Sequence, residues 1–339
     1  MSVNRSTLRA ILTTTAIAAV ASLGLAGCSA GGGGSDDEVI VGYSTYTVSN
    51  PAFAGIIKGL QDGADAHGYK LVITDSNLDP NQQVTDVQNL VTQGADYIVI
   101  TPADAAAIEP GVKAAENAGI PVFAIADTIN TEVTATFSMS HEEGGLLAAQ
   151  EVVEFLTEKY GAPEGKVVNI QGLAGTAAAV GRNDGFVNEL ANYPDIEIVA
   201  SQDGGWDTAP ANAAMSTILQ AQPEIDAVYA ANDAEAIGVT AALKDAGRYF
   251  PVGDPNHVYL IGVDGAKPAI EDIRAGVQDA TVSQNFVKMG TQLVDAIADW
   301  RDGTTDKVED VQWPLLVIRG DNIDSAEVAE YGIWADEVG

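Results

Sequence analysis

The stretch YKLVITDSNLDPNQQVTDVQNLVTQGADYIVITP, residues 69–102, decides the fold class of this chain. Its two ends, 69–76 and 95–102, are short apolar runs rich in Val and Ile, the composition of buried strands. Between them, residues 79–94 have the pattern of an amphipathic helix that ends at a glycine. Near-continuous apolar strands separated by helices are typical of parallel sheets that helices cover on both faces, so the stretch predicts an α/β fold.

The same alternation continues on both sides of this stretch. The expected strands are 38–43, 69–76, 95–102, 120–127, 165–172, 196–205, 226–233 and 257–265, and the expected helices are 50–68, 79–94, 104–119, 142–161, 185–194, 206–223, 234–247 and 267–276. The first helix shows its start clearly, because Asn50 is a good N-cap and Pro51 suits the first helical position. About eight strand–helix units are enough for two doubly wound sheets.

Length and charge limit the classes of partner. A chain of 339 residues can build two domains, each with its own core. Lys and Arg number 16 against 48 Asp and Glu, a net charge of −32. Because nucleic-acid binding depends on neutralising phosphates with Lys and Arg, this balance argues against nucleic acid as a partner. Anionic ligands such as nucleotides are disfavoured too, although a local pocket can override the global field.

The N-terminus has the layout of a secretory signal. Residues 1–10 carry two arginines and no acid, and residues 11–27 are uncharged and largely apolar. This run is somewhat short and rich in Thr and Ser for a membrane span of about 20 apolar residues. Cys28, the only cysteine, follows it, so an internal disulfide is excluded. A Gly/Ser-rich run after Cys28 reads as a flexible tether. A secreted protein with an incidental thiol is the alternative.

The stretch Leu25-Ala26-Gly27-Cys28 resembles the signal of bacterial lipoproteins. The resemblance implies removal of residues 1–27 and lipid on the sulfur and amine of Cys28, with residues 28–37 forming the lipidated cysteine and its tether. One acyl chain anchors a protein only marginally, so stable anchoring needs several. The protein is therefore expected outside the cytoplasm, held to the outer face of the cell membrane or in the periplasm.

Polar residues follow the carboxyl ends of several expected strands. Thr45, Asp127, Asn232 and Asp264 each end or follow an apolar run. In open α/β sheets ligands bind outside these ends. Any one such residue can instead cap the next helix or form a turn, but several from two sheets predict a ligand cleft.

The segment QGLAGTAAAVGRNDGF, residues 171–186, looks at first like a phosphate-binding loop after a strand. Its spacing argues otherwise, because five residues separate Gly175 from Gly181 and Arg182-Asn183 follows, where a P-loop has four residues and then Lys and Ser or Thr. The glycines do not fit the dinucleotide pattern G-x-G-x-x-G either. A turn with a surface arginine is the plain alternative.

Taken together, these residues resemble the type I sugar-binding proteins of ABC importers, above all the ribose-binding branch, over about residues 38–318. The resemblance implies two Rossmann-like lobes joined by a three-segment hinge. One lobe would comprise residues 38–139 with 285–314, and the other would comprise residues 140–284 with 315–339. It also implies a monosaccharide (pentose, hexose or deoxy sugar) or polyol as ligand and an ABC permease with a separate ATPase as partner. A monomer without cofactor or metal is expected.

The resemblance also assigns ligand-binding residues. They are Asn50 in the N-P-aromatic signature, Phe53, Asp127, Arg182, Trp206, Asn232, Asp264 and Gln284. These side chains suit a sugar, because Asp accepts from hydroxyls, Arg donates, and Asn and Gln do both. Aromatic rings can cover the C–H faces of a sugar ring. For Phe53 the alternative is core packing, since it shares a helical stripe with Ile56 and Leu60.

Two departures argue against ribose itself as the ligand. Asp127 is followed by Thr128 where the ribose binders have Arg, so a fork of donors is missing. The segment STYTVSNP, residues 44–51, is longer than the family's loop and adds Tyr46.

Three other functions compete with sugar transport. An enzyme is disfavoured, because His67, His141 and His257 show no metal-ligand spacing and no catalytic triad order stands out; for His141 a cap or hinge role is expected. A transcriptional regulator would need a basic DNA-binding module where this chain carries its signal. A lipoprotein that passes a ligand signal to a membrane receptor could have the same sequence.

Overall fold

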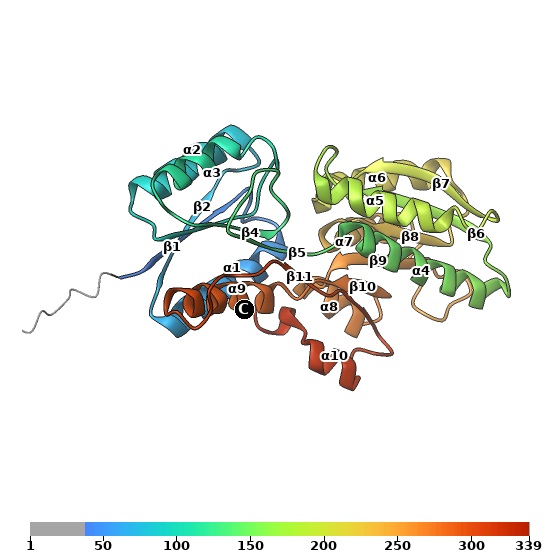
Figure 1. Ribbon diagram of the computed structural model, residues 1–339. Helices are drawn as coiled ribbons and strands as arrows, with labels where there is room; N and C mark the ends of the chain where they lie inside the picture. Colours follow the sequence, from blue (N-terminus) through green and yellow to red (C-terminus); the bar gives the residue numbers. More distant parts are fainter. Residues whose placement is uncertain (1–37, 339) are drawn as a thin grey trace, which may run out of the picture. The chain divides into compact units, whose positions relative to one another are not determined.

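Two six-stranded sheets organise residues 38–338, the part of the chain that this computed structural model describes (Figure 1). The predicted signal peptide, Cys28 and the tether lie outside the described residues. The first sheet has the strand order β11-β5-β4-β3-β1-β2, and the second has the order β12-β10-β9-β8-β6-β7. Each sheet thus repeats the same path. Among the described strands only β12 runs antiparallel to its neighbour, β10, so the predicted α/β fold with two parallel sheets is confirmed.

The strands of the first sheet are β1 (Ile40–Thr45), β2 (Lys70–Asp75), β3 (Tyr97–Ile100), β4 (Val122–Ala126), β5 (Ala135–Ser138) and β11 (Val311–Gln312). Its helices are α1 (Pro51–His67), α2 (Pro80–Thr92), α3 (Glu109–Asn117) and α9 (Phe286–Arg301). Helices α1 and α9 pack together on one face of this sheet, and α2 and α3 cover the other (Figure 1).

The strands of the second sheet are β6 (Gly165–Gln171), β7 (Ile196–Asp203), β8 (Ala227–Ala230), β9 (Tyr259–Asp264), β10 (Ala280–Ser283) and β12 (Leu316–Arg319). Its helices are α4 (His141–Tyr160), α5 (Ala177–Leu190), α6 (Thr208–Ala221), α7 (Asp233–Asp245), α8 (Lys267–Arg274) and α10 (Ala326–Tyr331), and the 3-10 turn η1 (Trp334–Asp336) follows. Helix α4 pairs with α5 on one face, and α6 pairs with α7 on the other.

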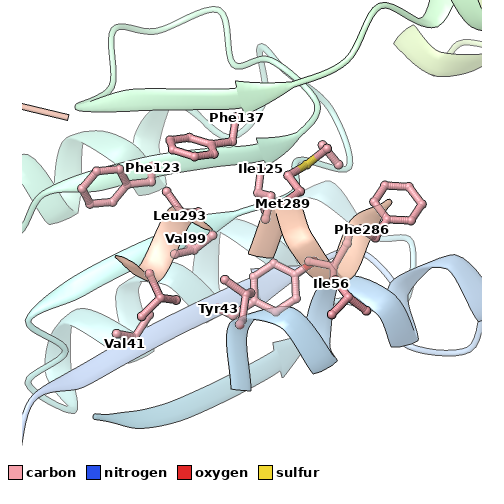
Figure 2. Close-up of a cluster of buried hydrophobic side chains, with 14 of the residues drawn as sticks. Val41, Tyr43, Ile56, Val99, Phe123, Ile125, Phe137, Phe286, Met289 and Leu293 are labelled. Atoms are coloured by element: carbon pink, nitrogen blue, oxygen red, sulfur yellow. The ribbon is translucent and has the colours of Figure 1, made fainter. Parts of the chain in front are cut away.

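Alternate residues of each strand feed opposite faces of the sheet. On β4, Phe123 and Ile125 join the cluster under α1 and α9, whereas Val122 joins the cluster under α2 and α3. Figure 2 shows the first of these clusters, in which Phe123 and Ile125 lie with Met289 and Leu293 of α9. Both sets of residues are buried, which explains why the strands are apolar at nearly every position. Burying each such side chain stabilises the fold by about 1.5–3 kcal/mol.

The chain passes between the two sheets at three places within the described residues: between β5 and α4, between β10 and α9, and between β11 and β12. The C-terminal turn also contacts elements of both. The Trp334 ring packs edge-on against Phe286 of α9 at 5.8 Å, and its Nε1 donates to the Asp264 carbonyl on β9 at 3.0 Å. The exact division of the chain into lobes stays a prediction.

One expected helix was placed wrongly. Helix α5 begins at Ala177 rather than at residue 185, because the Thr176 hydroxyl accepts from the Ala179 N–H and caps it. Arg182 therefore lies inside a helix and not in a loop. The sequence analysis also gave no elements for β5, α9 or the last three strands. Within residues 38–338 no helix combines the length and apolar character needed to cross a bilayer.

Candidate ligand-binding site

A cavity lies where strands of both sheets end at their carboxyl termini. All eight residues selected from the sequence line it: Asn50, Phe53, Asp127, Arg182, Trp206, Asn232, Asp264 and Gln284. The structure thus brings the whole set together, and contact of these residues with a ligand stays a prediction.

Arg182 projects from α5 and is held at both ends of its guanidinium. Its Nη1 donates to the Ala231 carbonyl at 2.6 Å, and its Nη2 donates to Asp264 Oδ1 at 3.0 Å. The guanidinium also lies over the Trp206 ring, 5.4 Å from its centroid, a cation–π arrangement. Only 5% of Arg182 is exposed. The arginine is therefore a fixed donor in the cavity wall and not a surface residue.

The charges of this pair depend on each other. Burial raises the pKa of Asp264, and the neighbouring Arg182 charge opposes that rise. Burial is the largest effect on the pKa of Arg182 and lowers it, but the charge and hydrogen bond of Asp264, together with other nearby acidic groups such as Asp127, leave the arginine pKa above its ordinary value. The Nε2 of Gln284 also donates to Asp264 Oδ1. One oxygen of Asp264 thus accepts from two donors, and its other oxygen is left to accept from a ligand.

The glycines around Arg182 serve helix packing. A Cβ at Gly145 of α4 would lie 1.9 Å from the Arg182 carbonyl oxygen, and one at Gly185 of α5 would lie 1.9 Å from the Glu142 carbonyl oxygen. Only glycine permits this approach, so α4 and α5 touch through their backbones. This contact sets where Arg182 enters the cavity, and it accounts for Gly185 without a phosphate ligand.

Trp206 is positioned by its backbone and by a buried carboxylate. Its φ of +64° lies in the left-handed region, which a tryptophan rarely adopts. Its N–H donates to Glu235 Oε1 at 2.8 Å, and the other carboxylate oxygen accepts from the Asn232 N–H at 3.2 Å. Burial raises the pKa of Glu235 well above its usual range. Glu235 therefore positions two cavity residues at once.

The ring of Trp206 lies against Gly172, where a Cβ would be 2.1 Å from the Trp206 Cη2 atom. The indole Nε1 is buried and has no hydrogen-bond partner within residues 38–338. The indole N–H is therefore an unpaired donor within the described residues, and only glycine at position 172 leaves room for the ring.

Both asparagines of the set are helix caps as well as cavity residues. Asn50 Oδ1 accepts from the Ala52 N–H at 3.0 Å at the start of α1. Asn232 Oδ1 accepts from the Glu235 N–H at 2.9 Å at the start of α7. Capping uses the oxygen of each amide, so the NH₂ groups can donate elsewhere. The Nδ2 of Asn232 donates to the Trp206 carbonyl at 3.4 Å, which leaves one of its two N–H groups over.

Phe53 belongs both to the core of the first sheet and to the lining of the cavity. It is 6% exposed and belongs to the cluster of the first sheet with Ile56 and Leu60, and it also lines the cavity. Its first-turn position on α1 explains this, because one edge of the ring meets the core and the other meets the cavity.

His141 is a cavity residue that the sequence analysis did not select. Its Nε2 lies 2.6 Å from Asp127 Oδ1, which joins the start of α4 to the end of β4. His141 is not the cap of α4, because Ser140 has that role and its hydroxyl accepts from the Glu143 N–H. The His141 Nδ1 is buried without a partner in the described part of the chain. No sequence signal distinguishes this contact from an ordinary helix start.

Tyr46 also lines the cavity and was not selected. Its ring meets Phe53 edge-on at 4.9 Å. The sequence signal that points to Tyr46 is the long loop after the first strand, residues 44–51.

Backbone strain concentrates at the cavity. Among the described residues, Ala126, Trp206 and Asp264 are non-glycine positions with φ of +69°, +64° and +125°, and all three line it. Such conformations cost about 1–3 kcal/mol each and persist where the surroundings impose them, often at functional sites.

The cavity offers hydrogen-bond donors, acceptors and aromatic faces, and it shows no arrangement for covalent chemistry. Within residues 38–338 no group of three or more His, Cys, Asp or Glu side chains could hold a metal ion. Elsewhere, His67 pairs with Asp295, and the buried His257 pairs with Asp279. The donors, acceptors and aromatic faces of the cavity suit the recognition of a polar ligand.

Comparison with known proteins agrees with this geometry. The sequence model described as periplasmic binding protein domain matches residues 41–305. The ribose import binding protein of Bacillus subtilis is 31% identical over 267 residues, which cover 78% of this chain and 83% of that protein. The xylitol-binding protein of Mycolicibacterium smegmatis is 29% identical over 316 residues, which cover 92% of this chain and 86% of that protein.

A solved structure is similar as well. The periplasmic solute-binding protein of an ABC transporter from Actinobacillus succinogenes, crystallised with D-allose, has a TM-score of 0.75 and 26% sequence identity. The match covers 84% of this chain and 98% of that one. Both the sequence and the fold of the two chains therefore correspond over nearly the whole body.

Proposed function

The chain belongs to the periplasmic binding protein family, and we propose that it captures a monosaccharide or polyol in this cavity and delivers it to the permease of an ABC transporter. The family binds solutes for transport and does not carry out catalysis. A pentose, a hexose, a deoxy sugar and a polyol all fit the proposal. The named relatives bind ribose and xylitol, which supports this class of ligand.

The observation that carries the proposal is the number of hydrogen-bonding groups in the cavity that remain available once their hydrogen bonds within the protein are counted. Asp127 and Asp264 each have an oxygen that can accept, and Arg182, Asn50 and Asn232 can donate. Sugars and polyols carry hydroxyls that donate and accept at once. A cavity built to bond each hydroxyl rejects compounds that leave these buried groups unpaired.

The aromatic residues suit the apolar faces of the same ligand. In the proposal, Phe53 and Trp206 cover the C–H faces of the sugar, while Gln284 supports Asp264 and bonds a neighbouring hydroxyl. Arg182 donates to hydroxyls and to a ring oxygen. In the proposal no residue of the set binds an anion. This agrees with the net charge of −32, which disfavours anionic ligands.

The proposed mechanism follows from the fact that the cavity residues belong to two different lobes. Residues 38–139 with 285–314 form one lobe, and residues 140–284 with 315–339 form the other. A ligand that bonds both Asp127 on one lobe and Arg182 on the other binds the closed arrangement more tightly than the open one. It shifts the population toward the closed arrangement by as much as the two affinities differ. The permease then recognises the closed form, and a separate ATPase supplies energy.

We also propose that the protein works as a monomeric lipoprotein outside the cytoplasm. Removal of residues 1–27 and lipidation of Cys28 would anchor it through the tether of residues 28–37. Mass spectrometry of membrane-extracted protein tests this, because diacylglycerol and an acyl group on an N-terminal cysteine have a defined mass. An intact N-terminal methionine would contradict it.

The central test is a thermal-shift screen of the protein against aldoses, ketoses, deoxy sugars and polyols. A ligand at 100-fold above its Kd stabilises the folded state by about 2.7 kcal/mol, a visible rise in Tm. One sugar or polyol standing out supports the proposal and names the ligand. A folded protein that responds to none of them, but to a nucleoside or an amino acid, would refute it.

A further inference from the structure

Tyr46 lies in the segment between β1 and α1, and its backbone is anchored to the neighbouring loop. Its carbonyl accepts from the Leu78 N–H at 2.7 Å, and the carbonyl of Thr45 accepts from the Ser76 N–H at 3.0 Å. The Thr45 hydroxyl also donates to the Thr47 carbonyl at 3.2 Å. These bonds fix the direction in which the Tyr46 ring leaves the chain.

The ring extends the aromatic wall that Phe53 begins. The two rings meet edge-on, with centroids 4.9 Å apart and an interplanar angle of 75°. Ala52, which also lines the cavity, presents only a methyl group. The aromatic surface beside Phe53 therefore comes from the long loop and not from the helix.

Tyr46 borders the central cavity and two outer clefts. One cleft shares Asp127 and Ala178 with the central cavity. The other shares Asn50 and Trp206 with it. Of all the residues that line these three spaces, Tyr46 alone borders every one. Tyr46 is therefore the residue that these three spaces have in common.

The Tyr46 hydroxyl is available to a ligand. It makes no hydrogen bond to any other residue between 38 and 338, although it lies near the charges of Asp127 and Arg182. Burial raises the pKa of Tyr46 well above its usual range, the Asp127 charge adds to the rise, and the Arg182 charge opposes it. The phenol is thus protonated at neutral pH and can both donate and accept.

We infer that Tyr46 sets the specificity of this site for a single unsubstituted monosaccharide or polyol. Its ring closes the cavity toward both outer clefts, so a second sugar unit or a bulky substituent has no exit, and its hydroxyl bonds one hydroxyl of the ligand. The inference rests on the proposed function, and it adds a size limit and a residue that imposes it.

Isothermal titration calorimetry on the full chain tests the inference with Tyr46→Ala and Tyr46→Phe. The probes are D-ribose, D-allose, xylitol and myo-inositol, and for each compound that binds, a derivative carrying one glucosyl unit. Tyr160→Phe is the matched control, because Tyr160 is exposed at the opposite end of α4 from His141, about 28 Å away along the helix.

The wild type and the control should bind a free compound and bind its glucosyl derivative at least 100-fold more weakly. Tyr46→Ala should weaken binding of the free compound by about 10-fold or more and reduce that discrimination to below 10-fold, because the ring is gone. Tyr46→Phe should keep the discrimination and lose about 3- to 10-fold in affinity, the effect of one hydrogen bond.

The outcomes separate the inference from the proposed function. A wild type that binds a free compound and its derivative equally overturns the size limit and leaves sugar binding standing. Unchanged affinity and discrimination in Tyr46→Ala overturns the role of Tyr46 in the same way. If Tyr46→Ala does not fold, Tyr46→Phe decides, and wild-type affinity in that variant overturns the hydroxyl contact. A wild type that binds no sugar or polyol overturns both.

Discussion

Replacing Arg182 by methionine tests the electrostatics of the cavity without any ligand. The substitution keeps much of the side-chain volume and removes the cation that faces Asp264 at 3.0 Å. Only 4% of Asp264 is exposed, so its charge cannot be hydrated in place of the lost partner. The Ala231 carbonyl loses its 2.6 Å donor at the same time.

The expected cost follows from breaking a buried pair by removing one member, about 3–5 kcal/mol of unfolding free energy. For a domain of 150–250 residues each kcal/mol corresponds to about 2–4 °C, so Tm should fall by about 6–20 °C at pH 7. Arg274→Met is the control, because Arg274 pairs with Asp336 at an exposed site, 43% and 51% open to solvent. Such a pair contributes about 0–1 kcal/mol.

The deficit should depend on pH with a definite sign. Burial raises the pKa of Asp264 already in the wild type, and loss of Arg182 raises it further. A carboxyl whose folded pKa lies above its unfolded value destabilises the fold as pH rises past the unfolded value, about 3.9. The difference in Tm between wild type and Arg182→Met should therefore shrink as pH falls toward about 4 and grow toward neutrality.

Calorimetric melting at several pH values measures this, and the double variant Arg182→Met/Asp264→Asn completes the design. The double variant should recover about half or more of the lost unfolding free energy, since neither member of the buried pair is then charged. It should still bind no sugar. An Arg182→Met protein that melts within 2 °C of wild type at pH 7 would refute the reasoning, because Asp264 would then not need its partner.

Three further expectations concern packing, titration and positioning. Gly145→Ala puts a Cβ 1.9 Å from a backbone oxygen of α5 and should lower the free energy of unfolding in urea by about 3 kcal/mol. Gly144→Ala, whose Cβ would have its nearest neighbour at 3.7 Å, should leave that free energy unchanged or raise it. Equal effects of the two substitutions would contradict the packing argument. Burial lowers the pKa of His257, but the Asp279 carboxylate outweighs this effect and raises the pKa. The contribution of His257 to the unfolding free energy is therefore complete below about pH 6.5 and is lost as pH rises through the folded pKa. His257→Gln should abolish that part of the pH dependence of stability, and an unchanged profile would count against this reasoning. Glu235→Gln leaves one of two backbone N–H groups without an acceptor and should cost about 1–3 kcal/mol while weakening sugar binding; wild-type affinity would exclude its positioning role.

Much of the cavity could be predicted because local patterns carry it. Asp127 and Asp264 end or follow apolar runs, and ligands of open α/β sheets bind outside the carboxyl ends of the strands, so the strand pattern predicts that each residue lies at the ligand-binding edge of its own sheet. Asn50 was readable as a cap before a proline. The resemblance to sugar-binding proteins then selected Arg182 and Trp206.

Other features of the cavity have no local signal. His141 meets Asp127 because the chain crosses from β5 into α4 at that point. Arg182 was assigned to a loop because the weak alanine-rich start of α5 shows no apolar stripe, and its helical position depends on the backbone contact with Gly145. Tyr46 was visible only as an extra residue in a long loop.

By itself the sequence determined the alternation of strands and helices, and with it two parallel sheets, because strand and helix periods are properties of neighbouring residues. The tertiary structure alone decided which way the side chains of Tyr46, His141 and Trp206 point. Their positions depend on contacts with residues that the fold brings near, such as the Trp206 N–H bonded to Glu235, 29 positions away. Packing between distant segments, and not local propensity, supplies the free energy that holds such side chains in place.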